Sequence, residues 1–382
     1  KVLTSASQDF TVKVGVTGLK SDQRYFYRFI FGDKISPVGQ TKTLATSTSK
    51  VSFAVCSCSN YPAGYFYVYR EMAKQNVDVV IHLGDYIYEY GADGYATEDA
   101  EKLGRTLAAD NNKEIIKLDD YRKRYALYRK DKDLQALHHR HPFIVIWDDH
   151  ELANDTWRDG AENHQVNEGS FMERKLAALQ AYFEWMPIRP IDEQHLKIYR
   201  QFDFGKLVQL TMLDTRIIAR DEQLDYANYM TANGLDIAKF QADLTNPART
   251  LMGYTQRDWL LGKLQQSTST WNVLGQQILM TKMLVPAELL LSLAEITSGN
   301  PTADTLNKMN MQITELVTLK MRLKQGDPSL TSQEKARILT VAPYNLDAWD
   351  GYFAEREILY GTLAQLKKKV VVLAGDTHNA WS

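Results

Sequence analysis

The sequence predicts an α/β fold, in which a large core of alternating strands and helices follows a smaller β-rich segment. Three observations carry this prediction. The first 45 residues contain stretches that alternate apolar and polar side chains with period two, as half-buried strands do. From Val51 onward, short apolar runs alternate with longer helical patterns, which is typical of a parallel sheet covered by helices. Five of these runs each lead into an ionisable residue, and ligands bind at the carboxyl ends of strands in such sheets.

The N-terminal segment is predicted to be part of a β domain. Residues 9–14 and 24–29 both alternate and are predicted as strands. The surroundings of Tyr25 resemble the tyrosine-corner region of fibronectin/Ig-like sandwiches. Too few strands fit into residues 1–45 for a whole sandwich, which needs about seven strands. We therefore expect a partial β-sandwich domain, followed by a Ser- and Thr-rich linker at residues 41–49.

The core of the predicted fold consists of five strands with helices between them. The strands are predicted at Val51–Cys56, Val77–Leu83, Phe143–Trp147, Leu207–Leu213 and Val370–Leu373. They end at Cys58, Asp85, Asp148–Glu151, Asp214 and Asp376, in that order. Helices are predicted at 64–76, 118–137, 174–185, 289–296 and 309–323. The last two belong to a helical insertion at about 285–342 that also contains a capping box, Thr331 with Glu334, and that is expected either to pack peripherally or to form a lid.

The composition excludes several classes of partner. Lys and Arg total 45 and Asp and Glu total 47, a formal charge of −2, so no basic footprint indicates a specific nucleic-acid partner. No apolar run reaches the length of about 18 residues that predicts a transmembrane segment. Cys56 and Cys58 are too close for an unstrained disulfide and do not indicate a disulfide framework. Because Lys1 begins the chain without a Met or a leader, we expect either a removed leader or a fragment. The oligomeric state is left open.

Asp85 and Tyr88 are the first candidate metal ligands. A carboxylate at a strand end can bridge two cations, and a phenolate three residues further on is a hard anionic donor. A free phenol has a pKa of about 10, so binding it as a phenolate at neutral pH requires a strong Lewis acid such as ferric iron. A lone Gly-Asp-x-x-Tyr is more often a turn carboxylate beside a core tyrosine. The metal interpretation therefore depends on the other strand ends.

Three further strand ends supply ligand types. Cys58 follows its strand in a polar turn, where a thiolate ligand is plausible chemistry. The stretch Asp148–Glu151 places three acids and an imidazole after a buried strand, which is costly unless their charge is compensated or solvated. Asp376 and His378, one residue apart, can point into the same site from the last strand end.

These motifs together resemble one known family. Gly84-Asp85-x-x-Tyr88, Asp149-His150-Glu151 and Gly375-Asp376-Thr377-His378 resemble, in this order, the blocks of calcineurin-like metallophosphatases. Ser57-Cys58-x-Asn60 and Trp349-Asp350-Gly351-Tyr352 resemble the PhoD-type alkaline phosphatase/phosphodiesterase subgroup. The resemblance implies a four-layer metallophosphatase β-sandwich flanked by helices for residues 46–382, the catalytic domain, with the partial domain at 1–45.

The resemblance also implies two metal ions. The first would be Fe³⁺, bound by Cys58, Asp85, Tyr88 and His378. The second would be bound by Asp85, Asp149 and Asp376. A set of oxygen ligands suits Ca²⁺ or Mg²⁺ better than zinc, so Ca²⁺ is expected there, with Mg²⁺ or Zn²⁺ as alternatives.

The function implied is the hydrolysis of phosphodiesters and phosphomonoesters at alkaline pH, by attack of a metal-activated hydroxide on phosphorus. The substrates would be small phosphate esters or phosphodiester polymers, and the protein would be secreted or periplasmic. Catalytic roles fall to Asp85, as the bridging ligand, and to His150, which would protonate the leaving oxygen or else orient a ligand. Arg216 would clamp a phosphate oxygen unless it pairs with Asp214 or Asp221. Asn60 is a candidate substrate contact.

Two alternatives remain open at this point. A purple-acid-phosphatase-like Fe–Zn enzyme shares the tyrosine after the aspartate, but its second site should carry histidines where Asp149 and Asp376 stand. A non-catalytic calcium-binding protein or truncated remnant would keep the acidic residues without the reaction.

Overall fold

The computed structural model describes residues 1–191, 196–231, 234–297 and 302–379 and has a mixed α/β fold. By their internal contacts, the residues fall into two compact units. The first contains 1–222, 250–279 and 359–382, and the second contains 223–249 and 280–358.

The first sheet of the larger unit is parallel and has the order β5-β6-β7. Its strands are β5 (Phe53–Cys56), β6 (Val79–His82) and β7 (Phe143–Val145). Between them the chain forms α1 (Tyr67–Lys74), η2 (Ala109–Asn111), α2 (Leu118–Tyr128) and α3 (Lys132–Arg140). The apolar, β-branched runs of β6 and β7 have no polar face because helices cover the sheet.

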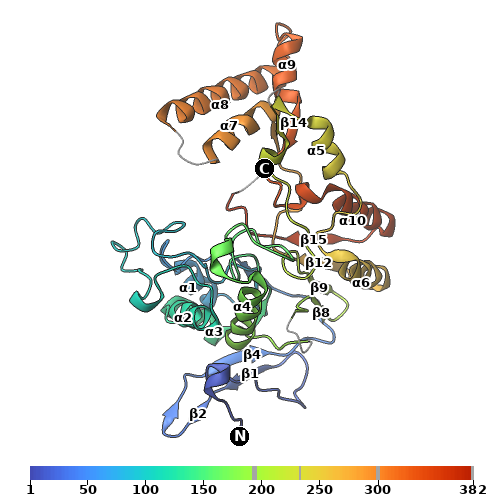
Figure 1. The fold of residues 1–382 in the computed structure, drawn as a ribbon. Helices are drawn as coiled ribbons and strands as arrows, with labels where there is room; N and C mark the ends of the chain where they lie inside the picture. The colour runs from blue at the N-terminus through green and yellow to red at the C-terminus, as the bar shows by residue number, and fades with distance from the viewer. Residues whose placement is uncertain (192–195, 232–233, 298–301, 380–382) are drawn as a thin grey trace. The chain divides into compact units, whose positions relative to one another are not determined.

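The second sheet has the order β15-β12-β9-β8 (Figure 1). Its strands are β8 (Arg200–Phe204), β9 (Val208–Met212), β12 (Trp271–Gly275) and β15 (Val370–Leu373). β9, β12 and β15 are parallel, and β8 pairs with β9 as an antiparallel edge strand. Helices α4 (Phe171–Trp185) and α6 (Gly253–Gln266) and the 3₁₀ turn η3 (Val166–Glu168) complete this part of the unit.

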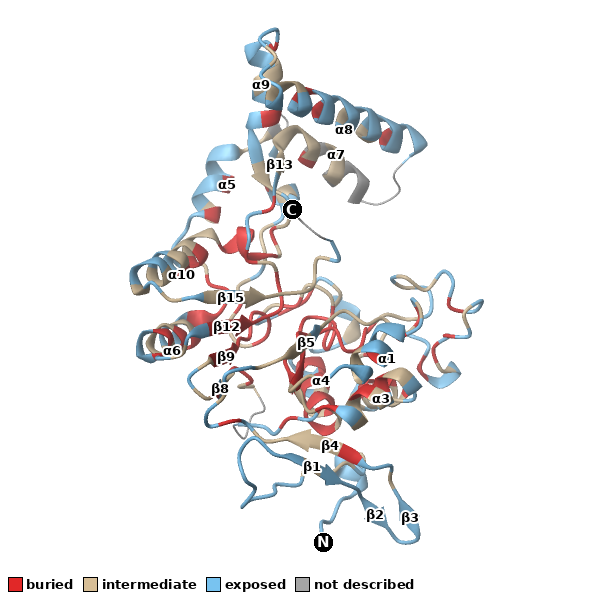
Figure 2. Cartoon of the chain, turned by 180° about the vertical axis from the view of Figure 1, so that it is seen from behind, coloured by how far each residue is buried: buried red, intermediate tan, exposed pale blue. Residues whose placement is uncertain are grey.

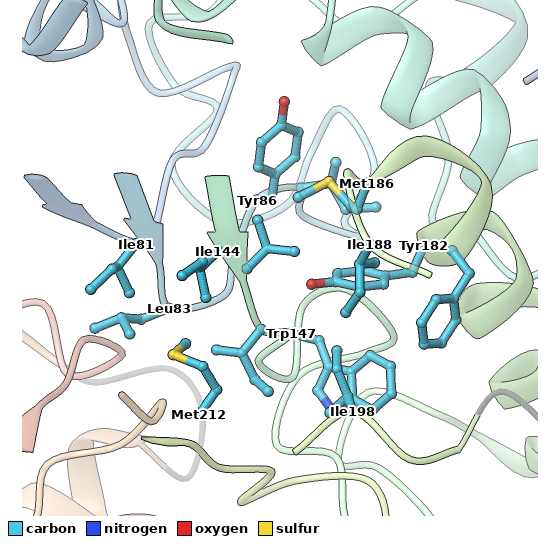
Figure 3. Close-up of a cluster of buried hydrophobic side chains, with 14 of the residues drawn as sticks. Ile81, Leu83, Tyr86, Ile144, Trp147, Tyr182, Met186, Ile188, Ile198 and Met212 are labelled. Carbon is cyan, nitrogen blue, oxygen red and sulfur yellow. The ribbon is translucent and has the colours of Figure 1, made fainter. Parts of the chain in front are cut away.

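Both sheets contribute to one buried cluster (Figures 2 and 3). Ile81 and Ile144 enter it from the first sheet and Met212 from the second, around the fully buried Trp147. Residues of α4, including Tyr182, pack on the indole from another side. Burying each of these large apolar side chains contributes about 1.5–3 kcal/mol to the stability of the fold, so this cluster fixes the strand ends that follow β6 and β7.

The five predicted strands are confirmed, but one helix prediction is wrong. The pattern at 118–137 predicted one long helix, whereas the structure has α2 and α3 with a break at residues 129–131. The Asp131 carboxylate accepts the backbone N–H groups of Asp133 and Leu134, which caps α3. A single capping residue does not interrupt the apolar periodicity of a sequence, so the helical pattern continued across the break and concealed it.

The N-terminal segment contains four short strands, but not the first of the two that were predicted by position. β1 (Arg24–Tyr27) pairs with β4 (Gly39–Lys42), and β2 (Ile30–Phe31) pairs with β3 (Lys34–Ile35), both antiparallel. The strand predicted at 9–14 is absent, because Asp9 and Phe10 after η1 (Ala6–Gln8) have left-handed backbones with φ of 47° and 54°.

The second unit is mainly helical. Its elements are η4 (Tyr226–Tyr229), β10 (Met230–Thr231), β11 (Gly234–Leu235), α5 (Ile237–Leu244), β13 (Leu284–Pro286), α7 (Ala287–Thr297), α8 (Ala303–Lys324), α9 (Ser332–Leu339), β14 (Val341–Pro343) and η5 (Trp349–Tyr352). The predicted capping box is present, with Thr331 and Glu334 bonding reciprocally at the start of α9. α10 (Phe353–Leu366) runs from this unit into the first.

Among the helices that the structure describes, none has the length and apolarity needed to span a bilayer.

Candidate active site

The ends of four parallel strands bring the predicted site residues together. Cys58 follows β5, Asp85 follows β6, Asp149 follows β7, and Asp376 and His378 follow β15. The backbone N–H of Asp376 donates to Cys58 Sγ at 3.2 Å, and this contact joins the end of the second sheet to that of the first. Residues distant in the sequence therefore share one edge, as strand-end ligands in α/β proteins do.

One group of possible metal ligands consists of Cys58, Asp85 and His378. Their ligand atoms lie within 4.8 Å of one another. The Tyr88 hydroxyl is 3.3 Å from Asp85 Oδ2 and 3.3 Å from His378 Nε2, so it joins the same group. These are the four residues predicted to bind ferric iron.

Two more groups share residues with the first. Asp85, Asp149 and His150 form one, and Asp148, Asp149 and Asp376 form the other, again with ligand atoms within 4.8 Å. The predicted second site thus has its three carboxylates in adjoining groups, together with Asp148, which the sequence did not single out as a ligand.

Two carboxylate oxygens in these groups indicate that the site can hold cations. Asp85 Oδ1 and Asp149 Oδ1 are buried and accept no hydrogen bond from any residue that the structure describes. Leaving such an oxygen without a partner is costly. A cation would satisfy both atoms, and the sulfur, phenol, imidazole and carboxylate donors around them suit one softer and one harder ion.

The backbone of the candidate ligands is strained. Four of them have a left-handed backbone conformation: Cys58 (φ 57°), Asp85 (φ 55°), Asp376 (φ 68°) and His378 (φ 50°). This conformation is uncommon for residues other than glycine and clusters at functional sites.

Close packing of the strand ends holds this conformation. A Cβ on Gly84 would come within 2.4 Å of the Asp148 backbone nitrogen, and one on Gly375 within 2.3 Å of Ser57 Oγ. Only glycine allows these two approaches, which explains why a glycine precedes the aspartate in both Gly-Asp motifs.

Glu151 ties the ends of β6 and β7 together. Its carboxylate accepts the backbone N–H groups of Asp85 at 2.9 Å, Tyr86 at 2.6 Å and Asp148 at 2.7 Å. Burial raises the pKa of Glu151 to about 7, against the opposing effect of these N–H groups. Its role is to position Asp85 rather than to bind a cation, which the short acidic motif did not distinguish.

Glu89 holds His150 in place and was not predicted. Glu89 is fully buried, and its Oε2 lies 2.7 Å from Nδ1 of His150. The other oxygen, Oε1, accepts the backbone N–H of Asn154 at 2.7 Å and the amide of Asn163 at 2.8 Å. The His150 ring also stacks on Tyr88, with ring centroids 4.2 Å apart. Because Nδ1 faces Glu89, Nε2 is the ring nitrogen that remains for other partners.

Arg216 is buried among the acidic residues of the site. Its guanidinium lies 2.5 Å from Asp148 and 2.7 Å from Asp376, and 3.8 Å from Asp149 Oδ1. The alternative of a surface ion pair with Asp214 or Asp221 is therefore wrong, since the side chain is fully buried. Asp214 instead accepts the backbone N–H groups of Arg216 and Ile217 and stabilises the turn after β9.

Asn60 lies beside the first group of ligands. Its amide nitrogen donates to the Tyr95 carbonyl at 2.9 Å, and its oxygen accepts from the Tyr128 hydroxyl at 3.1 Å. The residue thus anchors the loop that carries Tyr95. The Tyr95 hydroxyl in turn lies 3.1 Å from His378 Nδ1 and can fix the orientation of that imidazole.

The surrounding protein groups favour the ionised form of Asp149, but not those of Asp85, Cys58 and Tyr88. Burial raises the pKa of Asp85 well above its usual range, and the charges of Asp148 and Asp149 raise it further while His150 opposes them. Burial likewise raises the pKa values of the Cys58 thiol and the Tyr88 phenol. For Asp149, burial is outweighed by Arg216 and His150, which lower the pKa to about 2. Cations would stabilise the thiolate, the phenolate and the Asp85 carboxylate at neutral pH.

Comparisons with known proteins agree on one family. The family model described as "PhoD-like phosphatase" matches residues 53–382, and "PhoD-like phosphatase, N-terminal domain" matches residues 1–45. Alkaline phosphatase D of Bacillus subtilis (strain 168) is 35% identical over 379 residues, which cover 97% of this chain and 54% of that protein. A solved structure described as "Structure of PhoD" is 34% identical with a TM-score of 0.69, and the match covers 94% of this chain and 58% of that one. The chain thus spans about half the length of the curated relative that it matches.

Proposed function

The chain belongs to the PhoD-like phosphatase family, and from this premise we propose that it hydrolyses phosphodiesters and phosphomonoesters at the strand-end site. The observation that carries the proposal is the set of three overlapping groups of ligands, in which two buried carboxylate oxygens, Asp85 Oδ1 and Asp149 Oδ1, accept no hydrogen bond from the described residues.

We assign one ion, Fe³⁺, to Cys58, Asp85, Tyr88 and His378, and a second, Ca²⁺, to Asp85, Asp149 and Asp376. The phenol and thiol donors support iron, and the all-oxygen set supports Ca²⁺, with Mg²⁺ or Zn²⁺ as alternatives. When bound, such ions activate water for attack and neutralise charge on the phosphoryl oxygens. The Fe–Zn alternative is disfavoured by the carboxylates that occupy the second set of positions.

His150 is the residue to which we assign proton transfer. In the reaction, the oxygen of a water molecule bonds to phosphorus, the ester P–O bond breaks, and the leaving alcohol oxygen takes up a proton. The contact of His150 Nδ1 with Glu89 fixes the tautomer and leaves Nε2 for this transfer. Asn154 and Asn163 hold the Glu89 carboxylate, so the imidazole cannot rotate freely.

Arg216 has a different proposed role from the one that its sequence position indicates. Its guanidinium contacts Asp148 and Asp376, so it balances their charge and orients Asp376 as a ligand. Clamping a phosphate oxygen remains a second role for the same group. Asn60 contributes to the substrate side of the site through the loop that it holds.

We propose the four-layer metallophosphatase sandwich for residues 46–382, with the insertion at about 285–342, and a partial fibronectin/Ig-like domain for 1–45. The hydrogen bond from the Lys20 N–H to the Tyr25 hydroxyl, 2.8 Å long, supports a tyrosine-corner arrangement there. We further propose activity at alkaline pH, which the name of the relative supports, and a secreted or periplasmic location, which the family resemblance implies.

Removal of metal tests the proposed function. The purified chain should absorb visible light through charge transfer from tyrosinate and thiolate to iron, and should hydrolyse bis-p-nitrophenyl phosphate. Chelation should abolish the absorption and lower the rate by about 100-fold or more, because the ions supply most of the charge stabilisation. Iron should then be added back together with Ca²⁺, Mg²⁺ or Zn²⁺ in separate samples. The combination that restores the rate identifies the second ion.

Two results would contradict the assignment. A colourless, iron-free protein with full activity would remove the iron site. Calcium binding without hydrolysis of any phosphate ester would support the non-catalytic alternative instead.

A further inference from the structure

A second feature adjoins the proposed metal site: a cavity of about 520 Å³. It shares Cys58, Tyr88 and His378 with the first group of ligands and extends away from them toward Tyr65 and Phe66. This volume lies within the range of about 300–1,000 Å³ that small-molecule sites occupy. A group attached to a phosphate held at the metal site would therefore reach into it.

Aromatic rings form much of the wall, and two of them are held in place while exposed. Tyr65 and Tyr95 are 50% and 49% exposed. The Tyr65 hydroxyl donates to the Leu103 carbonyl at 2.8 Å, and its ring stacks on Tyr67 at 5.2 Å. The backbone carbonyl of Tyr95 is bonded by Asn60. Rings fixed at their tips or backbone lose little entropy when a ligand packs on them.

Apart from the ligands that it shares with the proposed metal site, the cavity carries no formal charge on its walls. Among the described residues that line it there is no lysine, arginine, aspartate or glutamate, and the polar groups are hydroxyls, one amide, two thiols and one imidazole. Away from those ligands, a second phosphate or a carboxylate would find no counter-charge. An uncharged group with ring faces would stack on the tyrosines.

We propose that this cavity is the subsite for the retained alcohol group of a phosphodiester, and that it selects uncharged, ring-bearing groups such as an aryl or sugar ring. The inference rests on the proposed function, because only a phosphodiester held at the metal site places a second ester group in the cavity. It names a substrate class that the family match does not supply: diesters with a neutral ring on the retained side.

The test compares two diesters with the same leaving group. Bis-p-nitrophenyl phosphate retains an aryl group and methyl p-nitrophenyl phosphate retains a methyl group, while both release p-nitrophenolate. The full chain should prefer the aryl ester in kcat/KM, mainly through a lower KM. Tyr65→Ala should lower the aryl-to-methyl ratio of kcat/KM by roughly tenfold, which is the loss of one stacking contact. Tyr65→Phe keeps the ring and should keep the ratio.

Gly64 offers a complementary test that adds bulk. Gly64 lines the cavity, and a Cβ on it would meet nothing within 4 Å, so Gly64→Leu adds apolar bulk at the cavity wall. It should lower the ratio in the same direction by excluding the aryl group. Two matched controls lie on α6 of the same unit: Tyr254, 51% exposed, and Gly262, where a Cβ also meets nothing within 4 Å. Tyr254→Ala and Gly262→Leu should leave the ratio unchanged.

The outcomes separate the subsite from the proposed function. If the wild-type chain hydrolyses neither ester, the proposed function fails. If it hydrolyses both, and neither Tyr65→Ala nor Gly64→Leu changes the ratio relative to the controls, the subsite is overturned and the hydrolase stands.

Discussion

Asp85 combines a backbone conformation that few non-glycine residues adopt with a buried oxygen that accepts no hydrogen bond from the described residues. Both features cost free energy in the folded state. Glu151 compensates part of that cost by accepting the N–H groups of Asp85 and Tyr86. The remaining cost is what we expect a bound cation to offset.

The identities of the site residues were predictable, but their supporting contacts were not. Cys58, Asp85 and Asp149 each follow an apolar run, so their strand ends marked them in the sequence. Glu89 lies 61 residues from His150, and nothing in a single sequence indicates a contact over that separation. The position of Arg216 after a strand end marked it in the sequence, but its contact with Asp148 is set by tertiary packing.

Glu89 provides a prediction about positioning. In Glu89→Gln the side chain keeps its size but loses the charge that orients His150, so kcat should fall by about 10–100-fold with little change in KM. The loss should be larger for alkyl phosphate esters than for p-nitrophenyl esters, because a poor leaving group depends more on proton donation. Steady-state kinetics on both ester types measures this difference.

The control for that variant is Glu184→Gln. Glu184 is also a poorly exposed carboxylate, but it pairs with Arg122 at 2.6 Å, outside the groups of ligands. It should keep the wild-type kcat on both ester types. Equal losses for alkyl and aryl esters in Glu89→Gln would argue against its role through His150.

At the scale of elements, the parallel strands explain why the prediction of a site succeeded. The carboxyl ends of β5, β6 and β7 point the same way, so residues after them must meet. β8 and β12 were not predicted, because Arg200–Phe204 and Trp271–Gly275 are short runs that mix polar with apolar residues. Tertiary pairing decides such segments more than their own pattern does.

The junction of α2 and α3 gives a prediction about stability. Asp131 caps α3 and also forms a nearly buried ion pair with Arg105, at 2.5 Å. Asp131→Ala removes the cap and leaves the guanidinium without its charge partner, so unfolding should become easier by about 3–5 kcal/mol. Asp133→Ala, in the first turn of the same helix, should cost about 0.5 kcal/mol. Chemical denaturation measures both, and equal losses would contradict the special role of Asp131.

For the whole molecule, the near balance of 45 basic and 47 acidic residues conceals a strongly acidic site. Asp85, Asp148, Asp149 and Asp376 lie in adjoining groups, with Arg216 as their neighbouring cation. The composition could not predict this acidic site, because a charge count averages over the whole chain. The division into two compact units was equally hidden, because segments 223–249 and 280–358 are separated in the sequence by residues of the other unit.

The central claim is that phosphate ester hydrolysis depends on cations held around Asp85. The most direct measurement is the rate of bis-p-nitrophenyl phosphate hydrolysis by the chain and by Asp85→Asn, each with its metal content determined on the same sample. Asp85→Asn keeps the shape of the side chain but removes the charge shared by two of the groups of ligands. We predict the loss of bound metal and a rate at least about 1,000-fold lower, since several kcal/mol of charge stabilisation are lost. A variant that retains full activity would contradict the account.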